Sequence, residues 1–378
     1  MAGTTHYVKI DKTKTLAEEP LTGHNRWHED IPPILTVDPG DTVVLDVRDA
    51  WDSQFDKDTT NDDVGRATTD LVHPHTGPVY VRDAEPGDLL EVRIGPTRCD
   101  RWGYTVQVPG FGFLRETYQA PHITKWDIAD NWATSEQIPG VRIPGAPFMG
   151  SIGVAPSTSL RETYLRREAE LLARGGAVKG PEPRGAVPAD PAIADEALRT
   201  IPPREIAGNI DVKQLTAGTT MLIPVATEGA LFSVADAHFA QGDGEVCGTA
   251  IEVAATFTAE LRLRKGEARR RGVQGLQFFR DALATGHGTT EPAWSTPTRF
   301  YATTGLPIRA DGTNESEDTS LAAANALHQM IAYLVDEWGY DEQQAYTICS
   351  VAVDLKISEM VDVPNFVVTA VLPLDIFI

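Results

Sequence analysis

The sequence predicts a β-rich α/β (α+β) fold, with mixed sheets in a sandwich- or barrel-like core and a few helices, mainly in the second half. Three observations support this class. Segments 37–45 and 84–92 both carry a Pro-Gly turn followed by alternating apolar and polar residues, a period of two that is typical of half-buried strands. Over 321–338, apolar residues recur at intervals of three and four residues, as in an amphipathic helix. The β-branched run 365–372 is typical of a buried strand.

The remaining elements follow in chain order. Residues 104–156, rich in glycine, proline and aromatic residues, are expected to form short strands and loops. A helix is predicted over 160–173, before an exposed Gly/Pro-rich excursion at 175–191. Strands are predicted at 219–225, 230–235 and 246–263. We expect the helix at 321–338 to begin at Thr319 or Ser320 and to end at Gly339, and Asp341 to cap a second helix through Cys349.

The 378 residues are expected to form one interwoven body. The alternative is a subdivision into a β-rich half (1–158), a helix with the Gly/Pro-rich excursion (159–203) and an α/β half (204–378). With 33 Lys+Arg against 54 Asp+Glu, the formal net charge is −21, which argues against nucleic acid and anionic membranes as partners.

The cellular location is predicted from apolar runs and cysteines. No stretch reaches the ~18 apolar residues of a membrane span, and no signal peptide is visible at the start. The three cysteines, Cys99, Cys247 and Cys349, are far apart and odd in number, which indicates a reducing compartment. We therefore expect a cytoplasmic protein.

Two charged segments have plain structural interpretations. The acidic loop could hold a calcium ion at a separate site, but it lacks the ligand spacing and glycine of a calcium loop, so a solvated turn is favoured; its carboxylates are Asp52, Asp56, Asp58, Asp62 and Asp63. The basic run 262–271 is expected to be a solvated turn or to form salt bridges between subunits, rather than a DNA-binding patch.

The segment 233–245 is the richest in chemically active side chains. Asp236 and His238 are two residues apart, so on a strand they project to one face and could chelate a divalent metal such as zinc. Gly242 and Gly244 allow a tight turn that returns Glu245 to this pair. Glu245 and Glu252 are therefore candidates for general acid/base work. A lone histidine is more often structural, but the density of polar groups here favours a site.

Other clusters add candidates. In His73-Pro74-His75 the proline indicates an irregular position, and we favour His73 over His75 as a ligand. Asn209 and Asp211 are expected to share a face, and the polar, aromatic run 24–28 includes His24 and Trp27. No Gly-x-Ser-x-Gly elbow, Walker motif or dinucleotide fingerprint occurs, and Cys247 is read as a buried strand cysteine.

These segments together resemble the acetamidase/formamidase family. The matching blocks run in order over nearly the whole chain: 24–28 with 30–32, 73–79, 84–88, 138–140, 150–156, 202–205, 208–211, 236–238 through 244–245, and 361–365. The opening His-Asn-Arg-Trp-His is most similar to the formamidase branch, whereas 148–156 is more similar to other branches.

The resemblance implies hydrolysis of the carbon–nitrogen bond of a small neutral amide, with release of ammonia. It also implies a metal site and a homo-oligomer. On this basis a metal, zinc by preference, would be held by His73, Asp236 and His238. Glu245 would move the proton, with Glu252 in reserve. The other assigned residues would orient or contact the substrate: Asp211, Asn209, Gln241, His24 and Trp27.

Three alternatives remain at this point. The resemblance also covers hydrolases of γ-lactams and other cyclic amides. A cupin-like metal-binding oxygenase or binding protein would fit the His-x-His and Asp-x-His pairs among short strands, although the expected Glu is not close to the His-x-His. A non-catalytic structural protein would leave the polar clusters without a role.

Overall fold

The computed structural model of the chain describes residues 3–176, 178–279, 299–359 and 367–378. Strands make up 33% and helices 21%, which confirms the β-rich class, and the strands that are described form no closed barrel. The described strands fall into one sheet of sixteen, one of three and one of two. The block 361–365 and the start of the run 365–372 lie outside the described residues.

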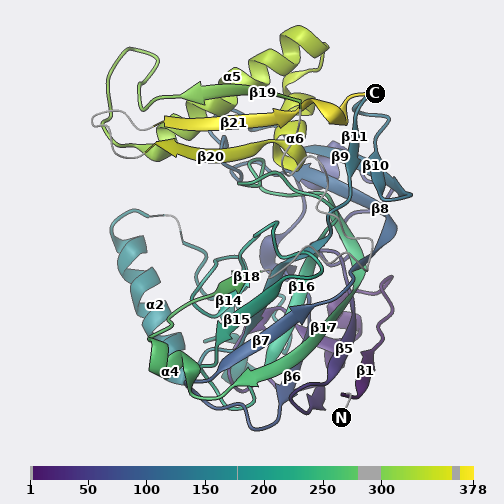
Figure 1. Ribbon diagram of the computed structural model, residues 1–378, viewed down its shortest axis with the longest axis vertical. Helices are drawn as coiled ribbons and strands as arrows, with labels where there is room; N and C mark the ends of the chain where they lie inside the picture. The colour runs from purple at the N-terminus through teal and green to yellow at the C-terminus, as the bar shows by residue number, and fades with distance from the viewer. Residues whose placement is uncertain (1–2, 177, 280–298, 360–366) are drawn as a thin grey trace.

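The sixteen-stranded sheet forms the body of the molecule (Figure 1). Its central path is β11 (Arg142–Pro144), β10 (Trp132–Thr134), β9 (His122–Ala129), β8 (Arg98–Gln107), β17 (Glu252–Arg264), β16 (Phe232–His238), β12 (Phe148–Val154) and β14 (Ala207–Asn209). Attached to it are β1 (Thr5–Val8), β2 (Gly23–His24), β4 (Leu35–Val37), β5 (Thr42–Val47), β6 (His75–Val81), β7 (Leu89–Ile94), β15 (Thr220–Pro224) and β18 (Gln277–Phe279). The pairs β1–β5 and β4–β6 are parallel and the central pairs antiparallel, so the sheet is mixed.

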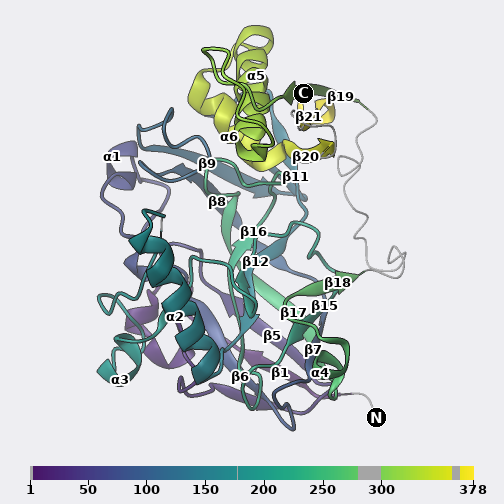
Figure 2. The same cartoon turned by 90° about the vertical axis from the view of Figure 1, so that its left-hand side faces the viewer.

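A separate lobe lies at the C-terminal end of the chain. Its three strands, in the order β19 (Phe300–Gly305), β21 (Val367–Pro373), β20 (Asp354–Glu359), pack on α5 (Thr319–Trp338) and α6 (Glu342–Ala352). We call these five elements the C-terminal lobe. Figures 1 and 2 show it above the large sheet, at the far end from the N-terminus. The remaining elements are β3 (Arg26–Trp27) paired with β13 (Leu198–Arg199), α1 (Asn61–Val64), α2 (Thr158–Ala173), α3 (Pro191–Ala194) and α4 (Glu267–Arg271).

Local signals explain most element boundaries. Gly40 and Gly87 both have φ near 100°, and both turns close with a 3.0 Å backbone hydrogen bond, which confirms the two Pro-Gly turns. The helix at 321–338 ends at Gly339 as predicted. It begins at Thr319, the first of the two predicted starts, and its N-cap is Asp318, whose side chain accepts from Leu321 N.

Two further boundaries were tested. Asp341 caps α6 as expected, although the helix continues to Ala352. The strand predicted at 246–263 begins only at Glu252. Residues 246–251 form a turn instead, in which Gly248 has φ 96° and Ala250 N donates to the Glu252 carboxylate at 2.9 Å.

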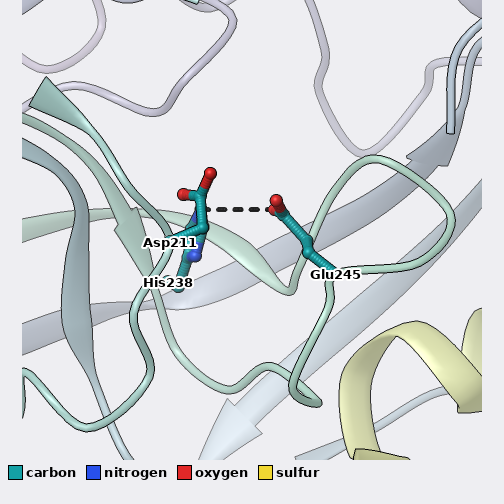
Figure 3. Close-up of side chains that lie close together, drawn as sticks. All are labelled: Asp211, His238 and Glu245. Atoms are coloured by element: carbon teal, nitrogen blue, oxygen red, sulfur yellow. Dashed lines mark ion pairs between the residues drawn. The ribbon is translucent and has the colours of Figure 1, made fainter. Parts of the chain in front are cut away.

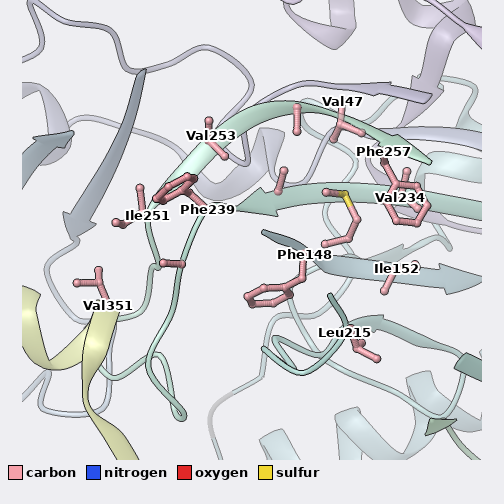
Figure 4. Packing of buried hydrophobic residues seen from close by; sticks show 14 of the residues in the cluster. Val47, Phe148, Ile152, Leu215, Val234, Phe239, Ile251, Val253, Phe257 and Val351 are labelled. Atoms are coloured by element: carbon pink, nitrogen blue, oxygen red, sulfur yellow. The ribbon is translucent and has the colours of Figure 1, made fainter. Parts of the chain in front are cut away.

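One apolar core reaches from the large sheet into the C-terminal lobe. Figure 4 shows Phe148 of β12, Val234 of β16, Phe257 of β17 and Val351 of α6 within it, and all four are buried. Burying such side chains is the main stabilising contribution in a fold of this kind. The core therefore fixes β16 and β17, which carry part of the polar cluster described below, and β12 beside them. Among the described helices, none has the length and apolar character needed to cross a membrane.

The two charged segments serve the fold. In the acidic loop, Asp52 accepts from Leu16 N, Asp56 caps its own turn and Asp63 closes the capping box of α1. The basic run forms salt bridges inside the chain: Arg264 with Glu91, Lys265 with Asp88, and Arg271 with Glu267. These bridges lie within one chain, so the predicted salt bridges between subunits stay a prediction.

Candidate functional site

The site is built first on β16 and β17. Asp236 and His238 leave the same side of β16, and His238 Nε2 is 3.1 Å from Asp236 Oδ1. His238 lies directly opposite Glu252 across the β16–β17 pairing, and its Nε2 is 3.4 Å from Glu252 Oε2. Facing residues on neighbouring strands are close enough to interact, so the strand pairing places this carboxylate on the histidine.

Two loops bring further carboxylates to His238. Asp211 follows β14, and Gln241 holds it by donating from Nε2 to Asp211 O at 2.8 Å. Gln241 Oε1 is also 2.9 Å from His238 Nδ1. Glu245 comes from the loop after β16, and its Oε1 is 3.8 Å from His238 Nε2. Figure 3 shows Asp211 beside His238, with Glu245 facing them across the ion pair.

The C-terminal lobe ties these two loops together. The Asp354 carboxylate, 5% exposed, accepts a 3.1 Å hydrogen bond from Asp243 N in the Glu245 loop. It also pairs with Lys213, two residues after Asp211. Leu355 N donates to Asp243 O, and Gly242 N donates to Ser350 O. Asp211 and Glu245 are therefore positioned by a part of the chain more than 100 residues away.

The backbone is strained where the cluster forms. Asp211, Asp236 and Glu245 have φ of 49°, 62° and 43°, a region that non-glycine residues rarely adopt. Between the β12–β16 pairs, Gly150 lies beside Asp236. A Cβ at Gly150 would lie 2.6 Å from Asp211 Oδ1, 2.6 Å from His238 Cε1 and 2.7 Å from Asp236 Oδ2. The glycine thus leaves open a space that three polar side chains share.

Burial and neighbouring charges shift the pKa values of the clustered side chains, and the direction of the shift differs between them. Burial, reinforced by the neighbouring Asp236 carboxylate, raises the pKa of Asp211 to about 7. Burial also raises the pKa of Glu252 to about 8, against the opposing effect of His238. Burial and Asp211 together raise the pKa of Glu245 well above its ordinary value.

Asp236 and His238 form the charged centre of the cluster. Burial disfavours the Asp236 carboxylate, but His238 and His73 outweigh it and hold its pKa below the usual range. Burial likewise disfavours the His238 imidazolium, yet Glu252 and Asp236 raise its pKa well above normal. The arrangement therefore gathers four carboxyl groups around one histidine in a poorly hydrated place, and Asp236 is the one whose charged form is favoured.

A cavity of about 1010 Å³ opens above the cluster. Six of the residues singled out from the sequence line it: His73, Asn209, Asp211, Asp236, Glu245 and Glu252. The predicted ligand His73 lies at the edge of the cluster, with Nε2 3.8 Å from Asp236 Oδ2. Burial lowers the His73 pKa, so the ring is neutral and able to act as a ligand.

Three of the assigned substrate contacts lie outside the cavity lining. Gln241 is buried behind His238 and Asp211, where it fixes both. His24 is buried with Nε2 2.8 Å from Ser233 Oγ on β16, and its ring packs edge-on against Trp27. His24 lies on β2, which pairs with β6, and Trp27 lies on β3, which pairs with β13. Both side chains are buried outside the cavity lining, and their contact with substrate stays a prediction.

Two further residues are explained by their surroundings. His75 is fully buried and holds the His73 backbone, since its Nδ1 is 3.0 Å from His73 O. Cys247 is 1% exposed, and burial raises the pKa of its thiol to about 11, which keeps it protonated at neutral pH. The structural interpretation of Cys247 is thus the better one.

Two overlapping groups in the described residues could hold a metal ion: Asp211, His238 and Glu245, and Asp236, His238 and Glu252, whose ligand atoms lie within 4.8 Å of one another. Oxygen and imidazole donors in this mixture suit a divalent cation. Within the described chain, Asp211 Oδ1 and His73 Nδ1 are buried without a hydrogen-bond partner. Unpaired buried polar atoms are costly, so these residues fit a cation.

Comparison with known proteins decides the family. The family model described as "Acetamidase/Formamidase family" matches residues 9–378. The chain belongs to the acetamidase/formamidase family. It is 35% identical to an acetamidase of Mycolicibacterium smegmatis over 90% of this chain and 87% of that protein, and 33% identical to a formamidase of Methylophilus methylotrophus over 98% and 93%.

A solved member of the same fold was also found. A "gamma lactamase from Delftia acidovorans" superposes with a TM-score of 0.91 at 32% identity, covering 98% of this chain and 93% of that one. The resemblance inferred from the sequence blocks is thereby confirmed. Sequence reasoning did not find the parts played by Gly150 and by the Lys213–Asp354 pair, because both depend on contacts between distant segments.

Proposed function

We propose that this protein hydrolyses the carbon–nitrogen bond of a primary amide of the formamide or acetamide type, producing a carboxylate and ammonia. The observation that carries the proposal is the meeting of His238 with four carboxyl side chains at the floor of a cavity, in a chain of the acetamidase/formamidase family. The names of two relatives above 30% identity, an acetamidase and a formamidase, support the same bond type.

The metal assigned to this site is zinc. We propose Asp236 and His238 as two ligands and His73, beside Asp236, as the third, with the ion taking the place of the proton that His238 otherwise holds. Bound there, the ion would lower the pKa of a coordinated water toward neutrality and polarise the amide carbonyl. The fit rests on the donor atoms and on the space beside Gly150.

Glu245 is the residue proposed to move the proton. Its side chain is 16% exposed and lines the cavity, whereas that of Glu252 is 2% exposed and is packed against His238. Glu245 takes a proton from the attacking water as the water oxygen bonds to the carbonyl carbon. It then gives that proton to the amide nitrogen as the carbon–nitrogen bond breaks and ammonia leaves. Glu252 remains the reserve acid/base.

Asn209 and Asp211 are proposed to orient the amide. Asn209 Nδ2 donates to Ile201 O at 3.2 Å, which fixes which way its side-chain amide faces. In the described structure its Oδ1 is buried without a hydrogen-bond partner and is free to accept an N–H from the substrate. Asp211 Oδ1 is placed to do the same. Both groups would hold the NH₂ end while the carbonyl points to His238 and Asp236.

A second candidate substrate is a γ-lactam or another cyclic amide. The structural likeness to the Delftia acidovorans γ-lactamase favours it. The same water attack would open the ring, giving an amino acid and no ammonia. The cupin-like alternative loses its support, because the chain matches an amide-hydrolase family and the described strands form no closed barrel.

Two properties of the whole protein are proposed with this function. Cys99, Cys247 and Cys349 are all free thiols, which supports a cytoplasmic protein. The homo-oligomer is proposed from the family resemblance alone.

One assay tests the proposal. Ammonia and carboxylate would be measured with formamide and acetamide, and ring opening of a γ-lactam by mass spectrometry, before and after chelation, with metal content measured in parallel. Ammonia release that is lost on chelation and restored by zinc is the expected result. Folded, zinc-loaded protein that hydrolyses none of these amides would overturn the proposal. Oxygen uptake with bound iron would favour the oxygenase.

A further inference from the structure

The cavity is larger than the proposed small amides require. Acetamide has four non-hydrogen atoms, whereas a volume of about 1010 Å³ is at the upper end of pockets that enclose much larger ligands. The polar groups lie together at its floor, where Asp211, Asp236, Glu245 and Glu252 meet. The reacting amide group occupies only this floor. The space above it is therefore left for another chemical group.

The walls above the floor are mainly apolar. Four separate stretches of the chain contribute to this collar: Trp51, Val72, Val108 with Phe113, and Ile201. Trp51 and Val72 are buried within a small apolar cluster of their own, at 6% and 3% exposure. Apolar walls attract apolar groups because burial removes both surfaces from water.

Three large apolar side chains extend the collar outward as a rim. Phe111 and Leu171 are each 41% exposed, and Leu172 is 60% exposed, although all three line the same cavity. Leu171 and Leu172 lie in the last turn of α2, whose preceding exposed residues include the charged Arg166 and Glu170. Exposed apolar side chains gathered at a pocket mouth are typical of binding surfaces.

The rim is held in place by glycines. A Cβ at Gly248 would lie 2.6 Å from Phe111 Cδ1, and a Cβ at Gly176 would lie 2.4 Å from Leu171 Cδ1. A Cβ at Gly112, which has φ 93°, would lie 2.7 Å from Cys247 O. Since a larger residue would displace these rim side chains, their position is a built feature of the fold.

We propose that the preferred substrate is a primary amide whose acyl group carries an apolar chain or ring of roughly five or more carbons. Its amide group lies on the acid–histidine floor, and its apolar part lies along the collar and rim. This inference rests on the proposed amide hydrolysis and adds the size and polarity of the acyl group. The continuity of the rim with the floor, within one cavity, is what assigns the rim to the substrate.

A series of amides tests the size preference. Acetamide, butyramide and hexanamide would be compared by kcat/KM, which we expect to rise by about fourfold for each added methylene, mainly through KM. A ratio of hexanamide to acetamide at or below one would overturn the inference while leaving amide hydrolysis intact. If no amide is hydrolysed, the proposed function fails, and calorimetric binding of hexanamide against acetamide still decides whether the apolar collar binds the chain.

Variants test the rim itself. Leu172→Ser is expected to lower the hexanamide-to-acetamide ratio by about threefold or more, because it removes apolar contact from the acyl chain. Leu21→Ser is the matched control, since Leu21 is 88% exposed and lies outside the cavity lining. An unchanged ratio in Leu172→Ser would overturn the role of the rim. A change of oligomer size by light scattering with an unchanged ratio would instead assign the rim to contact between copies of the chain.

Discussion

The acid–histidine cluster has a strand side and a loop side, and they are held in different ways. Asp236, His238 and Glu252 lie on β16 and β17, where the sheet pairing alone brings them into contact. Asp211 and Glu245 lie on loops with positive φ and depend on Asp354 of the C-terminal lobe. A ladder that resists deformation thus carries Asp236 and His238, two of the three groups proposed to bind metal. The loop side, which can shift by small amounts, carries Glu245, the residue proposed to move the proton.

The largest effect is expected on the strand side. His238→Ala removes the one imidazole around which the carboxylates gather and leaves buried Glu252 and Asp236 without it. We expect loss of bound zinc and at least a thousandfold loss of amide hydrolysis, a magnitude in keeping with removal of an essential group. Metal analysis and ammonia release would measure both.

The control for this prediction is His328→Ala, on the exposed face of α5. It should retain metal and activity. A folded His238→Ala protein that keeps its zinc and its turnover would refute the assignment of this residue.

The second prediction concerns the glycine between the two sides. Gly150→Ala places a methyl group within 2.7 Å of Asp211, Asp236 and His238 at once. We expect kcat to fall about a hundredfold, as displacements of about 1 Å do in active sites, with reduced zinc affinity. Gly180→Ala is the control, since no atom lies within 4 Å of its added Cβ. Normal activity in Gly150→Ala would mean that this space is not used.

The third prediction separates the two sides. Asp354→Asn loses the ion pair with Lys213 but can still accept from Asp243 N. We expect kcat to fall about tenfold, with little change in KM and with zinc retained, because the loops shift while the strands do not. Stability should fall too, since a buried charge loses its partner. Steady-state kinetics, metal content and thermal unfolding would be measured together.

The matched control is Asp336→Asn, an exposed aspartate of α5. It should behave as the unchanged protein. If Asp354→Asn lost zinc to the same extent as activity, the strand side and the loop side would not be held independently of each other.

The same division explains what could be predicted from the sequence. Side chains two residues apart on a strand point to the same face, so the sequence predicts that Asp236 and His238 lie side by side, as the structure confirms. This prediction is possible because strand geometry is local. The contact between His238 and Glu252 depends on strand pairing between residues separated by a turn, which no local pattern gives. The strand predicted to start at 246 was wrong for the same reason, since Glu252 accepts from Ala250 N and holds that turn.

Contacts over long sequence distances could not be predicted from local patterns; the placement of His73 beside Asp236 came from the family resemblance. Nothing near Lys213 indicates that Asp354 will pair with it. His24 and Trp27 were assigned to the substrate because the run is polar and aromatic. The structure places them on β2, which pairs with β6, and on β3, which pairs with β13, where both are buried outside the cavity lining. Which side of a sheet a polar run faces is decided by the whole fold.

The smallest predicted effect concerns this support behind the strand side. Burial lowers the pKa of His24 to about 4, from an ordinary 6.5, and its Nε2 is 2.8 Å from Ser233 Oγ on β16. The unfolded chain therefore binds a proton at higher pH than the folded one. Stability from this group is complete near pH 7 and is lost as the pH falls toward 4. At pH 6 the loss is about 1 kcal/mol.

Urea unfolding between pH 7 and pH 5.5 would measure this dependence. His24→Gln, which does not titrate, should be less stable overall but should lose less stability as the pH falls. Trp27→Phe is the control, because it perturbs the same ring contact without removing a titrating group and should keep the original pH slope. Equal slopes in all three proteins would show that His24 is protonated as easily in the fold as outside it. His24 would then add no pH-dependent stability to the strand side. The strand side would be held more firmly than the loop side by the pairing of its strands alone.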